Sequence, residues 1–135
     1  MKLFVYGTLK RGFSNHQLLK DSQFLGFAQT KDRYPLIKTY FGLPILLPFK
    51  DTGHNVRGEV YEVSSSLMKA IDKLEGHPNI NKRELISVIS DVAQKELKFV
   101  SIYFFQKTEL EELKDEELFR EYNEINIKDI FDTAH

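Results

Sequence analysis

Up to residue 49 the apolar residues lie mostly in short runs closed by glycine or proline, and this arrangement is typical of β-strands. Val56, Gly58 and Val60, for example, occupy alternate positions, as expected for one face of a strand. The strand-like segments are 2–6, 22–31, pieces of 34–49, 56–63, 85–92 and 97–106. The last two flank a polar stretch and are expected to form a hairpin.

Residues 64–75 give the clearest helical pattern. Their apolar positions recur at helical spacing and predict one core-facing stripe: Leu67, Ala70, Ile71 and Leu74. Serines at the start supply an N-cap, and Gly76 followed by Pro78 ends the helix. Residues 109–122 predict a second, acidic helix.

Because these strands and helices do not alternate as βαβ units, the sequence predicts an α+β fold. We expect a small mixed β-barrel with flanking helices. The length of 135 residues fits a single domain spanning 1–135, in which residues 107–135 form a C-terminal helical tail.

The composition argues against several classes of partner. A formal net charge of -1 gives no basic excess for nucleic acid or an anionic membrane, and no apolar run is long enough to span a bilayer. The chain contains no cysteine, which excludes disulfides, thiolate nucleophiles and cysteine-bound metals. The histidines show no metal-ligand spacing, so no metal or cofactor is predicted. We expect a cytoplasmic monomer.

The loop at 6–12, with the sequence YGTLKRG, follows the first strand and is the first place that could carry chemistry. Backbone N–H groups that turn outward after a glycine can bind a carboxylate or a developing oxyanion. The same pattern is also typical of an ordinary turn. A phosphate-binding loop is disfavoured, because Phe13 stands where the lysine of that motif should be.

Glu75 is the second place. It ends the predicted helix, where the macrodipole is negative and disfavours a carboxylate by about 0.3–1 kcal/mol. Its neighbour Leu74 belongs to the predicted core-facing stripe, so we expect the pKa of the Glu75 carboxyl to be raised. Such a group suits a proton shuttle, although the pattern alone also fits a solvated surface glutamate.

Several segments together resemble the γ-glutamylcyclotransferase-like superfamily, and most closely its γ-glutamylamine cyclotransferase branch. The resemblance is carried by FVYGTLKRG at 4–12 with Asn15 and His16, YPL at 34–36, LPILL at 43–47, GEVYEV at 58–63 and LEG at 74–76. It covers roughly residues 2–106. One departure is Asn81, which stands where the family commonly has a tyrosine, two residues before Arg83.

The resemblance implies that the substrate's own α-amine attacks its γ-carbonyl, which releases 5-oxoproline and a free amine. Glu75 is then the catalytic acid–base residue. The implied substrate-binding residues are Tyr6, Gly7, Thr8, Leu9, Asn15 and Arg83. Simpler roles remain open for three of them: Tyr6 as core, Asn15 as a cap of segment 16–20, and Arg83 on a strand face.

Two other functions remain open at this stage. The same chemistry could act on other γ-glutamyl amino acids or metabolites, and Asn81 puts the exact substrate in doubt. The chain could instead be a non-catalytic module that binds a small γ-glutamyl or carboxylate ligand. The acidic segment 109–122 is a further candidate for a lid or a partner surface.

Overall fold

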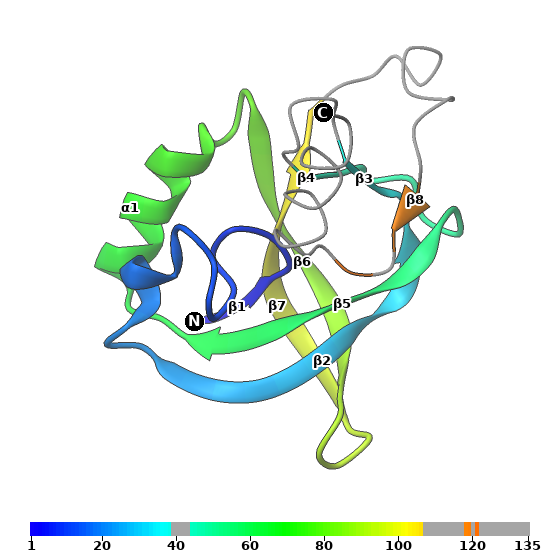
Figure 1. Cartoon of the computed structure of the whole chain (residues 1–135), viewed down its shortest axis with the longest axis horizontal. Helices are drawn as coiled ribbons and strands as arrows, with labels where there is room; N and C mark the ends of the chain where they lie inside the picture. Colours follow the sequence, from blue (N-terminus) through cyan, green and yellow to red (C-terminus); the bar gives the residue numbers. More distant parts are fainter. Residues whose placement is uncertain (39–43, 107–117, 120, 122–135) are drawn as a thin grey trace, which may run out of the picture.

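The computed structural model describes residues 1–38, 44–106, 118–119 and 121. Five strands close into a barrel in the order β1-β5-β2-β6-β7, and the helix α1 (Ser65–Glu75) lies along one side of it (Figure 1). The pairings are antiparallel except between β1 and β7, which confirms the predicted small mixed barrel. The barrel strands are β1 (Lys2–Val5), β2 (Gln23–Tyr34), β5 (His54–Glu62), β6 (Asn81–Ser90) and β7 (Glu96–Phe105).

A second, three-stranded sheet has the order β4-β3-β8. Its strands are β3 (Leu36–Lys38), β4 (Pro44–Leu46) and β8 (Leu118–Phe119). The predicted helix at 109–122 is therefore wrong at 118–119, where the chain pairs with β3. This pairing joins residues far apart in sequence, so local periodicity does not reveal it. The rest of that prediction lies outside the described residues.

The caps of α1 confirm the predicted helix. The Ser64 hydroxyl oxygen accepts a hydrogen bond from the Leu67 N–H at 3.1 Å, and Gly76 ends the helix in the left-handed conformation at φ 68°. The buried face differs from the predicted stripe, because it is centred on Met68 and Ile71. Leu74 is half exposed, since it lies near the helix end where a cavity opens.

Alternation along the strands divides the core in two. Phe4 and Val60 point into the barrel, while their neighbours Leu3, Val5 and Tyr61 belong to a second cluster with α1. The second cluster also includes Leu19, from the short 3₁₀ helix η1 (His16–Leu19). The apolar face of α1 is thus buried against the outside of the barrel wall.

The strand β6 begins at Asn81, four residues before the predicted strand start at residue 85. The first four residues of β6, NKRE at 81–84, are polar, so they show no strand-like alternation of apolar residues. Pairing with β7 extends the strand all the same, because Asn81 lies opposite Phe105 and Arg83 opposite Tyr103. This extension brings the start of β6 to the end of α1.

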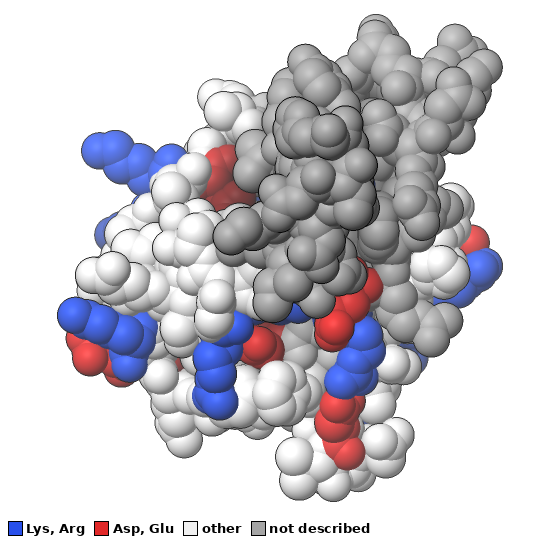
Figure 2. Space-filling model, in the orientation of Figure 1, with Lys and Arg blue, Asp and Glu red and all other residues white. Residues whose placement is uncertain are grey.

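The described surface carries both signs of charge. Figure 2 shows Lys and Arg interspersed with Asp and Glu on the face that it presents. Ion pairs between described residues include Lys31–Glu96 and Lys50–Asp32. No helix in this described part of the chain is long and apolar enough to cross a membrane.

Gly58 sits where β5 passes closest to β1, and we predict that it does not tolerate a side chain. A Cβ atom there would lie 2.4 Å from the Val5 carbonyl oxygen and 2.5 Å from Cζ of Phe4. We expect Gly58→Ala to lower the free energy of unfolding by about 1–3 kcal/mol, as overpacking of a core does. Urea unfolding would measure the loss.

The matched control is Gly12→Ala, because Gly12 has a positive φ of 86° but nothing within 4 Å of its would-be Cβ atom. It should report only the backbone strain, on the order of 1 kcal/mol. A Gly58→Ala variant as stable as the wild type would show that the contact with β1 does not exclude a side chain.

Candidate active site

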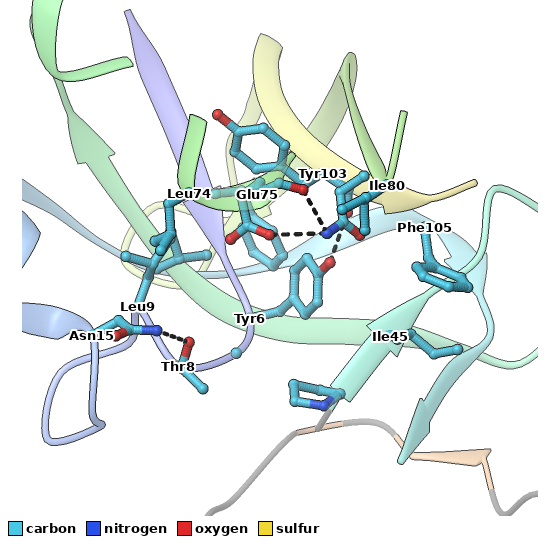
Figure 3. A pocket seen from close by; sticks show the side chains of 15 residues that line it. Tyr6, Thr8, Leu9, Asn15, Ile45, Leu74, Glu75, Ile80, Tyr103 and Phe105 are labelled. Atoms are coloured by element: carbon cyan, nitrogen blue, oxygen red, sulfur yellow. Dashed lines mark hydrogen bonds between the residues drawn. The ribbon is translucent and has the colours of Figure 1, made fainter. Parts of the chain in front are cut away.

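A cavity of about 290 Å³ opens at the end of α1 (Figure 3). Its lining comes from the end of β1 and the loop after it, the end of α1, the start of β6, β4 and the end of β7. The lining residues are Phe4, Val5, Tyr6, Gly7, Thr8, Leu9, Asn15, Pro44, Ile45, Leu74, Glu75, Ile80, Asn81, Tyr103 and Phe105.

The loop after β1 is held by its own carbonyl groups. The carbonyl oxygen of Gly7 accepts from the Lys10 N–H at 3.0 Å, and that of Thr8 accepts from the Asn15 N–H at 2.8 Å. The Asn15 side-chain amide also donates to the Thr8 hydroxyl at 2.8 Å. These bonds fix the shape of the loop, and its residues Gly7, Thr8 and Leu9 line the cavity.

A buried carboxylate on β5 fixes the far side of this loop. Glu59 is only 6% exposed, and one of its oxygens accepts from the Arg11 N–H at 2.9 Å and from the Tyr61 hydroxyl at 2.7 Å. The Arg11 guanidinium lies 4.1 Å from the centre of the Phe24 ring. The loop is therefore anchored to the barrel on both sides of Thr8 and Leu9.

Tyr6 lies between the barrel and the cavity: its ring packs against the barrel core and it also lines the cavity. Its hydroxyl donates to the Tyr103 carbonyl oxygen at 2.7 Å. Burial, and to a lesser extent the Glu75 carboxylate, raises the pKa of Tyr6. The phenol therefore stays protonated and neutral beside Glu75.

Glu75 points into the cavity from the last residue of α1 (Figure 3). Burial raises the pKa of its carboxyl group, as expected from its position. The Asn81 side-chain amide donates to the Glu75 main-chain carbonyl at 3.0 Å and to its carboxylate oxygen Oε2 at 3.2 Å. A basic carboxylate beside backbone N–H groups suits proton transfer at a carbonyl centre.

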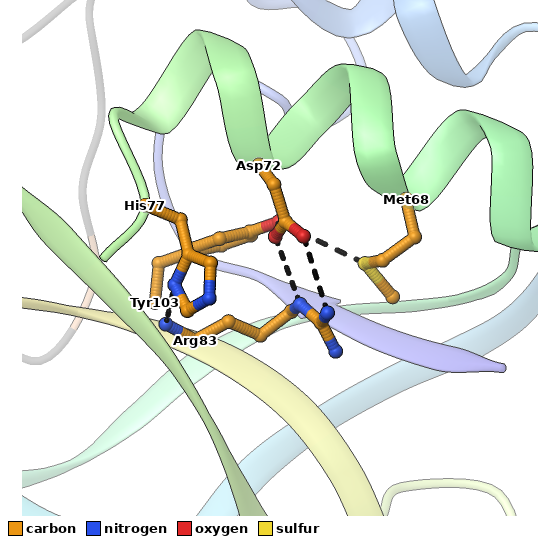
Figure 4. A network of polar contacts seen from close by, with 5 residues as sticks. All are labelled: Met68, Asp72, His77, Arg83 and Tyr103. Atoms are coloured by element: carbon orange, nitrogen blue, oxygen red, sulfur yellow. Dashed lines mark hydrogen bonds and ion pairs between the residues drawn. The ribbon is translucent and has the colours of Figure 1, made fainter.

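A polar network fastens α1 to the barrel next to this site (Figure 4). Asp72 accepts from Arg83 through both carboxylate oxygens, at 2.8 Å from Nε and 3.1 Å from Nη2, and from the Tyr103 hydroxyl at 2.6 Å. Burial would raise the pKa of Asp72, but the bonds from Arg83 and Tyr103 outweigh it and lower that pKa. His77 accepts from the Arg83 N–H at 2.9 Å.

The structure brings together all but one of the predicted site residues. Glu75 and the predicted binding residues of the loop line the cavity, as do Tyr6 and Asn15. Arg83 is not among the lining residues, and its guanidinium is engaged by Asp72. Its location agrees with the simpler of the two roles considered for it, a residue on a strand face.

Sequence reasoning singled out Asn81 but missed Ile80 and the part of the lining that comes from β4 and β7. Tyr103 stands between Ile102 and Phe104, and a tyrosine among apolar residues is one signal of a hydroxyl with a specific partner. Ile80 and Phe105 carry no comparable signal. Within the described residues no group of three or more His, Asp or Glu side chains has the geometry of a metal site.

The ion pair of Asp72 with Arg83 yields a prediction about stability. Asp72→Asn should lower the free energy of unfolding at pH 7 by about 1.5–3 kcal/mol, the range for hydrogen bonds to charged groups. The folded-state pKa of Asp72 lies below its ordinary value of 3.8, so its contribution is present above that value. Chemical unfolding should therefore show the difference between wild type and variant shrinking as the pH falls below about 4.

Asp91→Asn is the matched control. Asp91 also pairs with an arginine, Arg57, but its side chain is 38% exposed on the β6–β7 turn. A smaller loss is expected there because solvent screens the pair. A pH-independent loss in Asp72→Asn would contradict the electrostatic explanation.

The sequence of this chain is similar to a known protein family and to several individual proteins. The family described as "Gamma-glutamyl cyclotransferase, AIG2-like" matches residues 3–123. A protein of Methanocaldococcus jannaschii, named as a candidate γ-glutamylcyclotransferase, is 39% identical over 107 residues, which are 78% of this chain and 85% of that protein. The rat γ-glutamylaminecyclotransferase is 38% identical over 92 residues, 64% of this chain. That match spans 62% of the rat enzyme, less than two thirds of its length.

The fold has a close counterpart among solved structures. The crystal structure of an AIG2-like protein from Mus musculus superposes with a TM-score of 0.82 at 28% identity and covers 90% of this chain and 87% of that one. The family match covers nearly the whole described barrel, and it includes the loop after β1 and Glu75. This chain belongs to the γ-glutamyl cyclotransferase, AIG2-like, family.

Proposed function

We propose that this member of the family acts on γ-glutamylamines, such as ε-(γ-glutamyl)-lysine, and releases 5-oxoproline and the free amine. The observation that carries the proposal is the placement of Glu75, a partly buried carboxyl group of raised pKa that faces the loop of Gly7, Thr8 and Leu9 across one cavity. The rat relative that bears the γ-glutamylamine name supports the choice of substrate.

The reaction requires no nucleophile from the protein. The substrate's α-amine nitrogen bonds to its own γ-carbonyl carbon, and the bond from that carbon to the leaving amine breaks. The cavity favours the folded-back conformer, and such positioning reaches effective molarities of about 10⁵–10⁸ M. Asn81 and Tyr6 beside Glu75 stay neutral, so Glu75 is the group that exchanges protons with the substrate.

Glu75 relays protons from the α-nitrogen to the leaving nitrogen. It accepts a first proton from the α-ammonium, whose deprotonation at neutral pH costs about 1.4–2.7 kcal/mol, and a second from the same nitrogen as the ring closes. Both protons pass to the leaving nitrogen, which departs as an ammonium, so the carboxylate is regenerated. The oxyanion that forms at the γ-carbonyl takes hydrogen bonds from the N–H groups of the loop. Each such donor contributes about 2.7–4 kcal/mol in comparable sites.

The cavity has two unlike sides that match the two halves of the substrate. In Figure 3 Thr8 and Asn15 lie to one side of Glu75, and Ile45 and Phe105 lie to the other. The polar side suits the α-amino acid end, which needs hydrogen-bond partners. The apolar side suits the methylene chain of the leaving amine.

Glu75→Gln tests the role of the carboxylate, because glutamine keeps the shape but accepts no proton. We expect the fold and ligand binding to remain and the rate of 5-oxoproline release to fall by about 10²–10⁴-fold. Circular dichroism and a binding titration would serve as the controls. Substantial turnover by the variant would remove Glu75 from the mechanism.

A substrate panel tests the leaving group. We expect the wild type to release 5-oxoproline from ε-(γ-glutamyl)-lysine with a higher kcat/KM than from γ-glutamyl-alanine or glutathione, because only the isopeptide places an unbranched methylene chain on the apolar side. A higher kcat/KM for another compound of the panel would change the proposed substrate but leave the proposed reaction unchanged. No product from any member, in folded protein, would favour a non-catalytic binding module.

A further inference from the structure

Asn81 stands where the family resemblance leads one to expect a tyrosine, and its side chain bonds directly to the candidate catalytic residue, Glu75. It is the first residue of β6 and lines the cavity. Its side-chain NH₂ group bonds to both the main-chain carbonyl and the carboxylate of Glu75, at 3.0 and 3.2 Å (dashed lines at Glu75 in Figure 3). One amide therefore bridges the helix end and the reactive group.

The turn between α1 and β6 aims this amide at Glu75. Gly76 reverses the chain at φ 68°, and its carbonyl accepts from the Ile80 N–H at 2.9 Å. The Gln106 N–H bonds to the Ile80 carbonyl at 2.9 Å and fixes the turn to the end of β7. Because the last carbonyls of a helix lack partners within it, the bond from Asn81 also completes the end of α1.

The ionisable groups around Glu75 are engaged elsewhere. Tyr6, directly after β1, donates to a main-chain carbonyl, and Tyr103 on β7 donates to Asp72. The charged groups nearby are Asp72 on α1 and its partner Arg83 on β6, with His77 in the turn between them. Among the described residues, Asn81 is the one side chain that donates a hydrogen bond to the Glu75 carboxylate.

We propose that Asn81 is the positioning residue of Glu75, which holds the carboxylate in the cavity and stabilises its ionised, proton-accepting form. This inference rests on the proposed function for its catalytic meaning. A hydrogen bond donated to a carboxylate favours the charged form and so opposes the effect of burial. An amide does so at every pH, because it does not titrate.

The test is the pKa of Glu75 itself, measured in folded protein by NMR of the ¹³C-labelled side-chain carboxyl group. Asn81→Leu has a similar size and no donor, and it should raise the pKa of Glu75 by about one unit, since one unit is a typical effect of a bond to a charged group. In parallel, the acidic limb of kcat/KM for 5-oxoproline release should move to higher pH by the same amount.

Asn81→Asp is the second variant, because it preserves the shape and covers the case in which the leucine variant does not fold. It places a second carboxyl group within 3.2 Å of Glu75, in the position of the amide nitrogen. The upper apparent pKa of the coupled pair should then lie above that of Glu75 in the wild type. The matched control is Asn79→Leu in the same turn, whose exposed side chain does not line the cavity.

The pKa of Glu75 and the release of 5-oxoproline are separate measurements, so failure of this proposal can be told apart from failure of the proposed function. An unchanged pKa of Glu75 and an unmoved acidic limb in folded Asn81→Leu would overturn the role of Asn81. An equal effect of Asn79→Leu would overturn it as well, because the shift would not depend on the bond. A raised pKa in a protein whose wild type makes no 5-oxoproline would support the contact and reject the catalytic function.

Discussion

The hydrogen bonds of Asp72 to Arg83 and Tyr103 are the contacts on which the rest of the site depends. They join α1 to β6 and β7 at one point, three residues before the helix ends at Glu75. The Tyr103 carbonyl in turn accepts a hydrogen bond from the hydroxyl of Tyr6, the residue that follows β1. Three strands and the helix thus converge on Tyr103, and the cavity forms where they meet.

Sequence reasoning succeeded where the signal is local. The Ser64 cap, the left-handed Gly76 and the position of Glu75 between them follow from residues within one helix, and all are present in the structure. The loop after β1 is equally local, because its turn bonds join residues at most seven apart. Predictions from such short spacings do not depend on knowing the tertiary fold.

The remaining parts of the site depend on pairing between distant segments. The polar start of β6 becomes a strand only because β7 lies beside it, and this pairing places Arg83 opposite Tyr103 and within reach of Asp72. The sequence left Arg83 between substrate binding and a place on a strand face; in the structure its Nε and Nη2 bond to Asp72 and it does not line the cavity. Likewise Phe119 lies opposite Leu36, a pairing that no local pattern predicts.

The electrostatics of Glu75 follow from a balance between opposing effects. Burial and the negative end of the helix dipole both favour the neutral acid, while the bond from Asn81 favours the carboxylate. Because the Asn81 amide does not titrate, its contribution to this balance is kept as the pH changes. A carboxyl group of raised pKa is suited to accept a proton and return it, which the proposed ring closure with loss of an amine requires.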